Sequence, residues 1–449
     1  MAAIPVSDAN APNMNAPVEE LTSIVGAENT RSYGELSEQW QQAIAQAVTP
    51  GTQISGVVYP GTQAELAEVV RRANEHQWGI LPCGNGSKLH WGGLSSESNW
   101  VVSTQRLNRL IEHAVGDLTV TAEAGMKLVD LQTCLAKAGQ FLALDPAYPE
   151  TATLGGIVAT SDAGSLRQRY GGVRDMLLGL SLIRADGATA KAGGRVVKNV
   201  AGYDLMKLMT GSYGTLGILS QVTFRLYPLQ VASQTVVLTG ETEAIAQASQ
   251  TLLHSALTPA ALDVLSTSTV TSLQIGKGMG LVVRFQSMAS SVQVQAERVL
   301  ALGQTLGLSS HLYADADETQ LWQQLGAPTL DTPEPIICKI GIRPAEAIAG
   351  LAQTEVMTSQ TAQGLIHASS GLGKLYLDGQ ATSVAMLLEL RALYQAKGGF
   401  LSVLQAPITV KQEFEVWGYA GSGLDLMRRL KHQFDPKNLL SPHRFVGGI

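Results

Sequence analysis

Hydrophobic residues change their spacing twice between Gly56 and Gly84. The segments GVVY and GILP are short and almost continuously apolar, whereas the apolar residues of QAELAEVVRRA, between them, recur every three or four positions. Thr62 and Glu65 stand at capping-box spacing at the start of that periodic segment. The pattern predicts a strand, a helix and a second buried strand, in an α/β arrangement.

The residues around the end of this second strand are unusually rich in glycine, and read LPCGNGSKLHWGG from Leu81 to Gly93. A loop with few Cβ atoms lets backbone N–H groups approach a ligand, and successive free N–H groups form a concavity suited to phosphate. Two further glycine-dense segments begin at Thr153 (TLGGIVATSDAGSLRQRYGG) and Gly211 (GSYGTLGILSQVTFRLYP). Between them, an Asp186–Gly187 turn joins two apolar runs.

The pattern changes after Pro228. Amphipathic runs such as TEAIAQASQTLLHSAL replace the glycine clusters, which predicts a separate α+β domain. The segment GSGLDLMRRLKHQFDPKNLLSPHRF, near the C-terminus, predicts an amphipathic helix that ends in a proline-containing turn. We therefore expect a disordered tail and lead-in over residues 1–48, a glycine-rich domain over 49–230, a second domain over 231–410, and a C-terminal segment over 411–449 that returns to the first domain.

Composition narrows the class of protein. The 449 residues are 45% hydrophobic and 15% charged, with a formal net charge of -6, so a large core is expected and a nucleic-acid-binding surface is not. The three cysteines, Cys83, Cys134 and Cys338, share no metal-ligand spacing, which argues against an iron–sulfur cluster or a disulfide framework. The N-terminus lacks the basic start of a secretory signal, and no apolar run is long enough to span a bilayer. These features predict a soluble protein of a reducing, cytoplasmic compartment.

Two common nucleotide motifs fail in the glycine segments. A Rossmann fingerprint requires glycine where the first loop has Leu89. The segment SSGLGKLY lacks the P-loop pattern because Ala368 replaces the upstream glycine and Leu375 follows the lysine. Each loop considered alone is equally well explained as a simple turn.

Considered together, the segments PCGNGS, TLGGIVATSDAG, RYGGVRD, NVAGYDL and GSYGTLGI, in that order, are more specific. They resemble the FAD-binding domain of the vanillyl-alcohol oxidase and p-cresol methylhydroxylase superfamily over residues 50–230. The resemblance implies an α+β fold, with a two-part FAD-binding domain of the p-cresol methylhydroxylase type and an α+β cap domain.

The resemblance also implies three sets of FAD-binding residues. The first would offer backbone N–H groups to the pyrophosphate or lie close to it: Pro82, Gly84, Asn85, Gly86, Ser87 and His90. The second would line the dinucleotide and approach the isoalloxazine: Thr153, Gly155, Gly156, Ala159, Thr160, Ser161 and Gly164. The third would pack on the adenosine side: Gly214, Gly217 and Ile218. Relatives that bind FAD covalently carry histidine where this chain has Ser87, so a non-covalent FAD is expected.

The second domain departs from the resemblance. Related 2-hydroxy-acid dehydrogenases carry a G-H-x-G-D-G-N-x-H motif whose histidines hold a metal. The matching segment LIHASSGLGK keeps His367 and Gly371, but has Ser370 for the aspartate, Leu372 for the asparagine and Lys374 for the second histidine. One imidazole beside a lysine is not a divalent-metal site. We expect no bound metal and interpret His367 as a structural residue.

A basic residue that usually follows the tryptophan of LWQQLGAP in such dehydrogenases is also absent, because Gln323 stands there. Capture of a substrate carboxylate calls for arginine or lysine. Lys339 and Arg343, in CKIGIRP, are the available substitutes, although we interpret both as surface charges. No catalytic residue is assigned from the sequence.

The chain combines an intact flavin domain with an altered cap. In this it resembles the FAD-binding subunits of glycolate oxidases, also called glycolate dehydrogenases, and the resemblance includes the segments GGRVVKNVAGYDLMKL and FVGG. This resemblance implies oxidation of glycolate to glyoxylate together with a homologous flavoprotein subunit, which carries the full histidine motif, and an iron–sulfur subunit. Membrane contact would then be peripheral, through partners. The alternatives are a free-standing, lactate-type 2-hydroxy-acid dehydrogenase and a non-catalytic assembly subunit. Whether this chain's own flavin takes the hydride, the exact acid, the final acceptor and the stoichiometry stay open.

Overall fold

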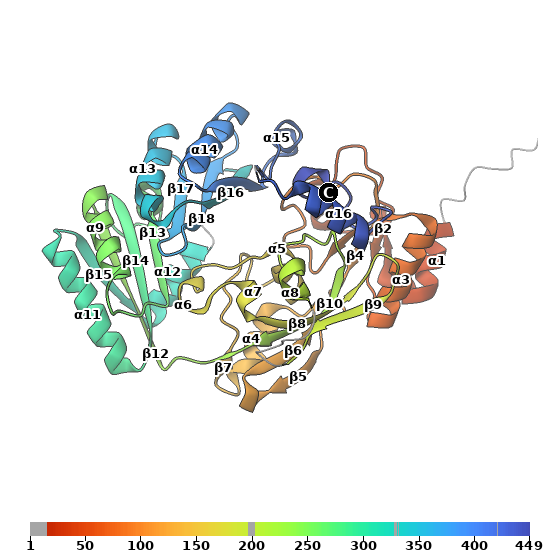
Figure 1. Cartoon of the computed structure of the whole chain (residues 1–449), viewed down its shortest axis with the longest axis horizontal. Coiled ribbons are helices and arrows are strands. Elements are labelled where there is room, and N and C mark those ends of the chain that lie inside the picture. The colour runs from red at the N-terminus through yellow and green to blue at the C-terminus, as the bar shows by residue number, and fades with distance from the viewer. Residues whose placement is uncertain (1–15, 196–202, 327–329, 331, 420) are drawn as a thin grey trace, which may run out of the picture.

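The computed structural model describes residues 16–195, 203–326, 330, 332–419 and 421–449. Two bodies lie side by side (Figure 1). One carries a large sheet covered by helices, and the other carries the smaller sheets and the glycine-rich loops. The α+β fold expected from the sequence is confirmed. Most of the NVAGYDL segment falls within residues 196–202, outside the described residues.

The first sheet has the order β1-β2-β4-β3. Its strands are β1 (Thr30–Ser32), β2 (Gly56–Val58), β3 (Gly79–Cys83) and β4 (Ser98–Ser103). Helix α3 (Gln63–His76) connects β2 to β3, which both run parallel to β4. Thr62 caps this helix by accepting a hydrogen bond from the Glu65 backbone N–H at 3.1 Å. The predicted strand, helix and strand are confirmed, and the apolar face of α3 is buried.

The second sheet is antiparallel with the order β5-β6-β10-β8-β9. Its strands are β5 (Leu110–Ala114), β6 (Thr119–Glu123), β8 (Leu177–Ile183), β9 (Thr189–Gly193) and β10 (Ile218–Arg225). The short strands β7 (Gln140–Phe141) and β11 (Tyr227–Pro228) pair beside it. Its helices are α4 (Leu128–Ala136), α5 (Leu154–Thr160), α6 (Arg167–Tyr170), α7 (Val173–Met176) and α8 (Leu205–Met209). The predicted Asp186–Gly187 turn joins β8 to β9, with Gly187 at a φ of 81°.

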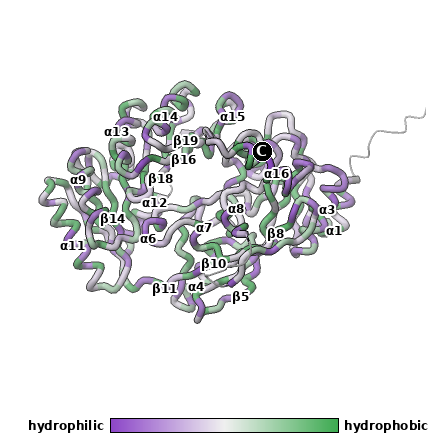
Figure 2. The backbone as a smooth tube through the Cα atoms, in the orientation of Figure 1, coloured by the Kyte–Doolittle hydropathy of each residue, from purple (hydrophilic) through white to green (hydrophobic). Residues whose placement is uncertain are grey.

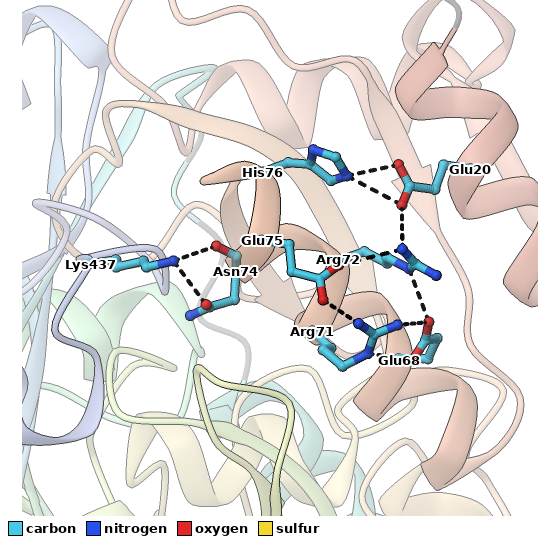
Figure 3. A network of polar contacts seen from close by, with 8 residues as sticks. All are labelled: Glu20, Glu68, Arg71, Arg72, Asn74, Glu75, His76 and Lys437. Atoms are coloured by element: carbon cyan, nitrogen blue, oxygen red, sulfur yellow. Dashed lines mark hydrogen bonds and ion pairs between the residues drawn. The ribbon is translucent and has the colours of Figure 1, made fainter.

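The structure differs from the expected disordered tail and lead-in at residues 16–48, whereas residues 1–15 lie outside the description. Helix α1 (Ala16–Val25) buries Leu21 and Val25 in the same core cluster as the apolar residues of α3, and α2 (Glu38–Ala45) follows β1. The alanine, proline and asparagine at the start of the chain obscure this short amphipathic pattern. Figure 3 shows Glu20 of α1 contacting His76 and Arg72 of α3, and Lys437 binding Asn74 of the same helix.

The cap contains one eight-stranded antiparallel sheet of order β15-β12-β14-β13-β17-β18-β16-β19. Its strands are β12 (Ala232–Gly240), β13 (Ala261–Leu265), β14 (Met279–Ser287), β15 (Ser309–Ala314), β16 (Pro335–Gly341), β17 (Gln363–His367), β18 (Leu372–Asp378) and β19 (Phe400–Gln405). Its helices are α9 (Thr242–Leu253), α10 (Thr267–Ser272), α11 (Ala289–Thr305), α12 (Asp315–Gly326), α13 (Ala347–Met357) and α14 (Val384–Ala396).

Along β16, β17 and β18, one face of this sheet is apolar and the other is polar. Ile336, Cys338 and Ile340 of β16 point into the hydrophobic core that α9, α11, α13 and α14 cover. Residues of opposite parity, such as Lys339, belong to the other face, because side chains alternate along a strand. Figure 2 shows the mixed hydrophobic and hydrophilic character of the covering helices α9 and α11. The uncovered part of the polar face is directed at the first domain, where its residues meet the site described below.

The C-terminal segment leaves the cap and lies against the first sheet. After α15 (Ile408–Glu413) and α16 (Leu424–Phe434), Leu440 forms a parallel bridge with Ile80 of β3. Lys431 of α16 is buried, and its ammonium contacts Asp435 at 2.6 Å and donates to the Thr215 carbonyl oxygen at 3.0 Å. Among the described residues, none of the helices combines the length and apolar character needed to cross a membrane.

Candidate functional site

The glycine-rich loop after β3 forms one wall of a cavity. Gly86 has a φ of 77°, in the left-handed region that glycine adopts without strain. A Cβ atom on Gly84 would lie 2.0 Å from Oγ1 of Thr153, so only glycine allows the loop to approach α5 this closely. Thr153 caps α5, and its Oγ1 accepts a hydrogen bond from the Gly156 N–H at 3.3 Å.

Most of the residues expected from the sequence meet around this cavity, which has a volume of about 730 Å³. Those that line it are Pro82, Gly84, Asn85, Gly86, Ser87, Thr153, Gly155, Gly156, Ala159, Thr160, Gly214, Gly217 and Ile218. A Cβ on Gly156 would meet only Thr153 Oγ1 within 4 Å, so a side chain there would extend into the cavity. We call this the flavin cavity.

Three expected residues do not line the flavin cavity. The Nε2 atom of His90 lies 2.9 Å from Oε1 of Gln405 in the cap, and burial lowers the pKa of this histidine to about 4. Ser161 lines a neighbouring cavity. Gly164 packs on Asp145, whose Oδ1 accepts a hydrogen bond from the Gly164 N–H at 2.9 Å. Some glycines of these segments therefore line the flavin cavity, whereas Gly164 allows close packing of the chain on Asp145.

The sequence reasoning missed eight lining residues, of which Arg444 bears most directly on the chemistry; the others are Cys83, Lys88, Leu89, Thr104, Ser212, Tyr213 and Leu219. The Arg444 Nη2 donates to the carbonyl oxygens of Leu89 and Trp91, at 2.5 and 2.9 Å, while its buried Nε has no hydrogen-bond partner. Arg444 is 4% exposed and makes no ion pair with any described residue. Burial lowers its pKa to about 10. No local signal identifies it, because 355 residues separate Arg444 from Leu89.

A buried guanidinium without an acidic partner is costly unless a ligand supplies the negative charge. Arginine is well suited to phosphate because it presents several N–H donors in a planar fork. The flavin cavity thus combines a glycine-rich loop, room for an extended ligand and an unpaired positive charge. This combination fits a phosphate-containing dinucleotide such as FAD.

A second cavity, of about 370 Å³, adjoins the flavin cavity and shares Thr160 and Tyr213 with it. It is lined from the first domain by Asp162 and Arg167, and from the cap by Lys339 and other residues of the polar sheet face. The expectation that Lys339 is a surface charge was therefore wrong, whereas Arg343 is exposed. The error arose because Lys339 belongs to the sheet face that meets the first domain.

Lys374 replaces the second histidine of the related metal motif and lines the second cavity. Its ammonium lies 3.6 Å from Oδ1 of Asp162, whose Oδ2 is 3.0 Å from the ammonium of the buried Lys88. Burial acts to lower the pKa of Lys374, but the Asp162 carboxylate and other nearby groups raise it overall. Lys374 therefore carries a positive charge at this site.

His367 also lines the second cavity, and its Nδ1 lies 2.6 Å from Oδ1 of the buried Asp263. This contact fixes the ring orientation. Within the described ranges, no group of three or more His, Cys, Asp or Glu side chains is placed to hold a metal ion. That the protein binds no metal stays a prediction.

Comparison with known proteins identifies the class. Residues 54–193 match the family model for the FAD binding domain. The structure is similar to that of p-cresol methylhydroxylase with substrate bound, with a TM-score of 0.75, 17% identity and coverage of 97% of each chain. The protein therefore has the p-cresol methylhydroxylase-type fold and an FAD-binding domain, and FAD is its cofactor.

Individual relatives match this chain over different shares of its length. Glycolate oxidase subunit GlcD of Bacillus subtilis is 30% identical over 226 residues, which cover 50% of this chain and 48% of that protein. Glycolate oxidase subunit GlcE of Escherichia coli is 38% identical over 169 residues, covering 37% and 48%. D-lactate dehydrogenase of Archaeoglobus fulgidus is 25% identical over 417 residues, covering 87% and 91%. The matched region thus spans about half the length of each glycolate oxidase subunit.

Proposed function

We propose that this chain is the FAD-binding subunit of a complex that oxidises a 2-hydroxy acid, with glycolate as the substrate and glyoxylate as the product. The observation that carries the proposal is the flavin cavity in a domain similar to two glycolate oxidase subunits, GlcD and GlcE. The proposed partners are a homologous flavoprotein subunit with the full histidine motif and an iron–sulfur subunit.

The residues of the flavin cavity have distinct parts in this proposal. Backbone N–H groups of Gly84 to Ser87 hold the pyrophosphate, and the Arg444 guanidinium supplies its counter-charge. The α5 residues, from Thr153 to Thr160, present backbone and small side chains to the rest of the dinucleotide. When bound, FAD supplies hydride acceptance, while the protein supplies position and electrostatics.

The cysteines support a separate iron–sulfur subunit, because they do not form a cluster site within this chain. Cys83, Cys134 and Cys338 are all free, and they belong to β3, α4 and β16. Burial raises the pKa of Cys83 and Cys338 to about 12, which disfavours the thiolate that cluster ligation requires. In this proposal, electrons that reach the flavin leave for the iron–sulfur subunit. Peripheral membrane association through such partners is part of the same proposal.

One observation favours a second candidate, a free-standing lactate-type dehydrogenase. The D-lactate dehydrogenase of Archaeoglobus fulgidus aligns with this chain over 91% of its length, unlike either glycolate oxidase subunit. The two candidates differ in what the isolated chain does with substrate.

The deciding experiment has two parts. The tagged chain is purified from its native cell, and copurifying proteins are identified. Flavin reduction by glycolate, and by each enantiomer of lactate, is then followed by anaerobic stopped-flow absorbance, first for the isolated FAD-loaded chain and then for the complex. We expect slow or absent reduction in isolation and rapid reduction in the complex. Rapid reduction of the isolated chain by D-lactate, without partners, would instead establish the free-standing dehydrogenase.

A colourless chain that copurifies with the same partners would indicate the third alternative, a non-catalytic assembly subunit. The flavin content of the purified protein is therefore measured before the kinetic experiment.

A further inference from the structure

Lys339 and Lys374 stand directly opposite each other in the cap sheet. They are register partners in the antiparallel pair of β16 and β18, so their side chains project from the same sheet face. Directly opposed Cβ atoms in such a pair lie about 5 Å apart. Like charges at this spacing repel, so the arrangement is unfavourable unless negative charge lies close to both.

The protein itself supplies little of that negative charge. The Asp162 carboxylate acts on both ammonium groups and lies 3.6 Å from that of Lys374, but it is already paired with Lys88 at 3.0 Å. Lys339 makes no hydrogen bond or ion pair through its ammonium with any described residue. Arg167 adds a further positive charge to the lining of the second cavity. The cavity thus contains more positive than negative charge.

The position of the second cavity places an anion beside the flavin cavity, although Lys374 and His367 also border a third cavity of about 1580 Å³. At about 370 Å³ the second cavity is half the size of the flavin cavity, and Thr160 and Tyr213 border both. The His367 ring, fixed by Asp263, adds a polar group that can contact a hydroxyl or carbonyl oxygen of the same ligand. A small molecule with one carboxylate and a neighbouring oxygen matches this set of groups.

We propose that the second cavity is a binding site for a small carboxylate of the 2-hydroxy-acid or 2-oxo-acid class, whose carboxylate lies between the ammonium groups of Lys339 and Lys374. The inference rests on the proposed function for the identity of the acid, and it adds that this chain binds the acid itself rather than only relaying electrons. The positive charge comes from lysine side chains without a metal ion.

The test measures binding rather than turnover. The FAD-loaded chain is titrated with oxalate, a dicarboxylate that has no carbinol hydrogen to transfer, at constant ionic strength. Binding is followed by the change in flavin absorbance and, independently of the flavin, by isothermal titration calorimetry. We expect saturable binding of one oxalate per chain, and a Kd about 10- to 100-fold larger in Lys339→Met, since one charge-assisted contact is lost.

Arg343→Met is the matched control, because Arg343 belongs to the same CKIGIRP segment but is exposed. It should bind oxalate as the wild type does. Lys374→Met is the second variant in case Lys339→Met does not fold, and Lys339→Arg should recover part of the affinity because it keeps the charge. Thermal melting of each variant checks that it is folded.

Several results would overturn the inference. Undetectable binding of oxalate, equal weakening in Arg343→Met, or unchanged binding in both lysine variants would each do so. Sulfate that competes as strongly as oxalate would indicate a general anion site instead of a carboxylate site. Failure of the proposed function would look different. In that case the complex would not oxidise glycolate, but the chain would still bind oxalate through Lys339, and the assignment of the second cavity would stand.

Discussion

The flavin cavity and the second cavity are built from different materials. The flavin cavity is walled mainly by backbone and small side chains from three glycine-rich segments, together with a few larger side chains such as Lys88, Tyr213 and Arg444. The second cavity is walled by charged side chains from separate elements, such as Asp162 after α5, Lys339 on β16 and Lys374 on β18. Backbone and small residues accommodate a large cofactor closely, whereas side-chain charges select a small ligand.

The largest predicted effect concerns how the flavin cavity holds its cofactor. Ser87 stands where covalent relatives have histidine, so treatment with trichloroacetic acid should release all of the FAD into the supernatant. The supernatant is measured by absorbance and identified by chromatography. Flavin that remains with the precipitated protein would contradict a site that holds FAD only through backbone contacts and charge.

Closing the flavin cavity should abolish FAD binding. A Cβ atom on Gly156 would point into the flavin cavity, so Gly156→Val places a branched side chain there. The helical backbone of α5 fixes this direction. We expect a loss of FAD affinity of more than about 100-fold, measured by fluorescence titration of the apoprotein.

Gly34→Val serves as the control for this variant. Gly34 is exposed, and a Cβ there meets nothing within 4 Å. Its FAD affinity should equal that of the wild type. Normal FAD occupancy in Gly156→Val would mean that the cofactor lies elsewhere.

Arg444 tests whether side-chain charge also matters in the flavin cavity. Arg444→Met should weaken FAD binding by about 10- to 100-fold, because a charge-assisted contact to the anionic cofactor is lost. Arg444→Lys should lose less, and the exposed Arg429→Met should lose nothing. Riboflavin, which lacks phosphate, separates two roles, since its affinity should be nearly unchanged by Arg444→Met if the guanidinium binds the pyrophosphate.

The difference between the cavities also explains what the sequence could predict. The flavin cavity was largely predictable, because its glycines lie in contiguous segments, as from Gly84 to Ser87, that resemble a known domain. Arg444 was not predictable, because it meets Leu89 only through the return of the C-terminal segment. Lys339 was misinterpreted because the alternation of side chains along a strand assigns each residue to one of two sheet faces, but does not tell which face meets another domain.

The same reasoning applies to the fold. The first strand, helix and strand followed from hydrophobic spacing, whereas the α+β class of the whole chain followed from the resemblance to a known domain. Helix α1 was missed because the residues before Leu21 dilute its pattern, and its stability comes from packing on α3 rather than from local propensity. His90 was assigned to the flavin cavity from its position in the loop, whereas its contact with Gln405 depends on the placement of the cap.

The last predicted effect concerns stability rather than cofactor binding, and arises where the cap meets the glycine-rich loop. Lys411 of α15 is buried and donates a hydrogen bond to the His90 carbonyl oxygen. Burial, and secondarily Arg444, lowers the pKa of Lys411 to about 7. In the unfolded chain a lysine keeps a pKa of about 10.4, so between about pH 7 and 10 the unfolded state binds one proton more than the folded state. The free energy of unfolding therefore rises with pH across this window, by about 1 kcal/mol per pH unit from this group, and the stabilisation is absent below about pH 7.

Urea unfolding at pH 7, 8, 9 and 10 should show the wild type gaining stability relative to Lys411→Met as pH rises, while the exposed Lys191→Met keeps a constant difference from the wild type. A constant difference for Lys411→Met as well would mean that its ammonium stays charged in the folded protein, so that side-chain charge is tolerated at the flavin loop without an acidic partner.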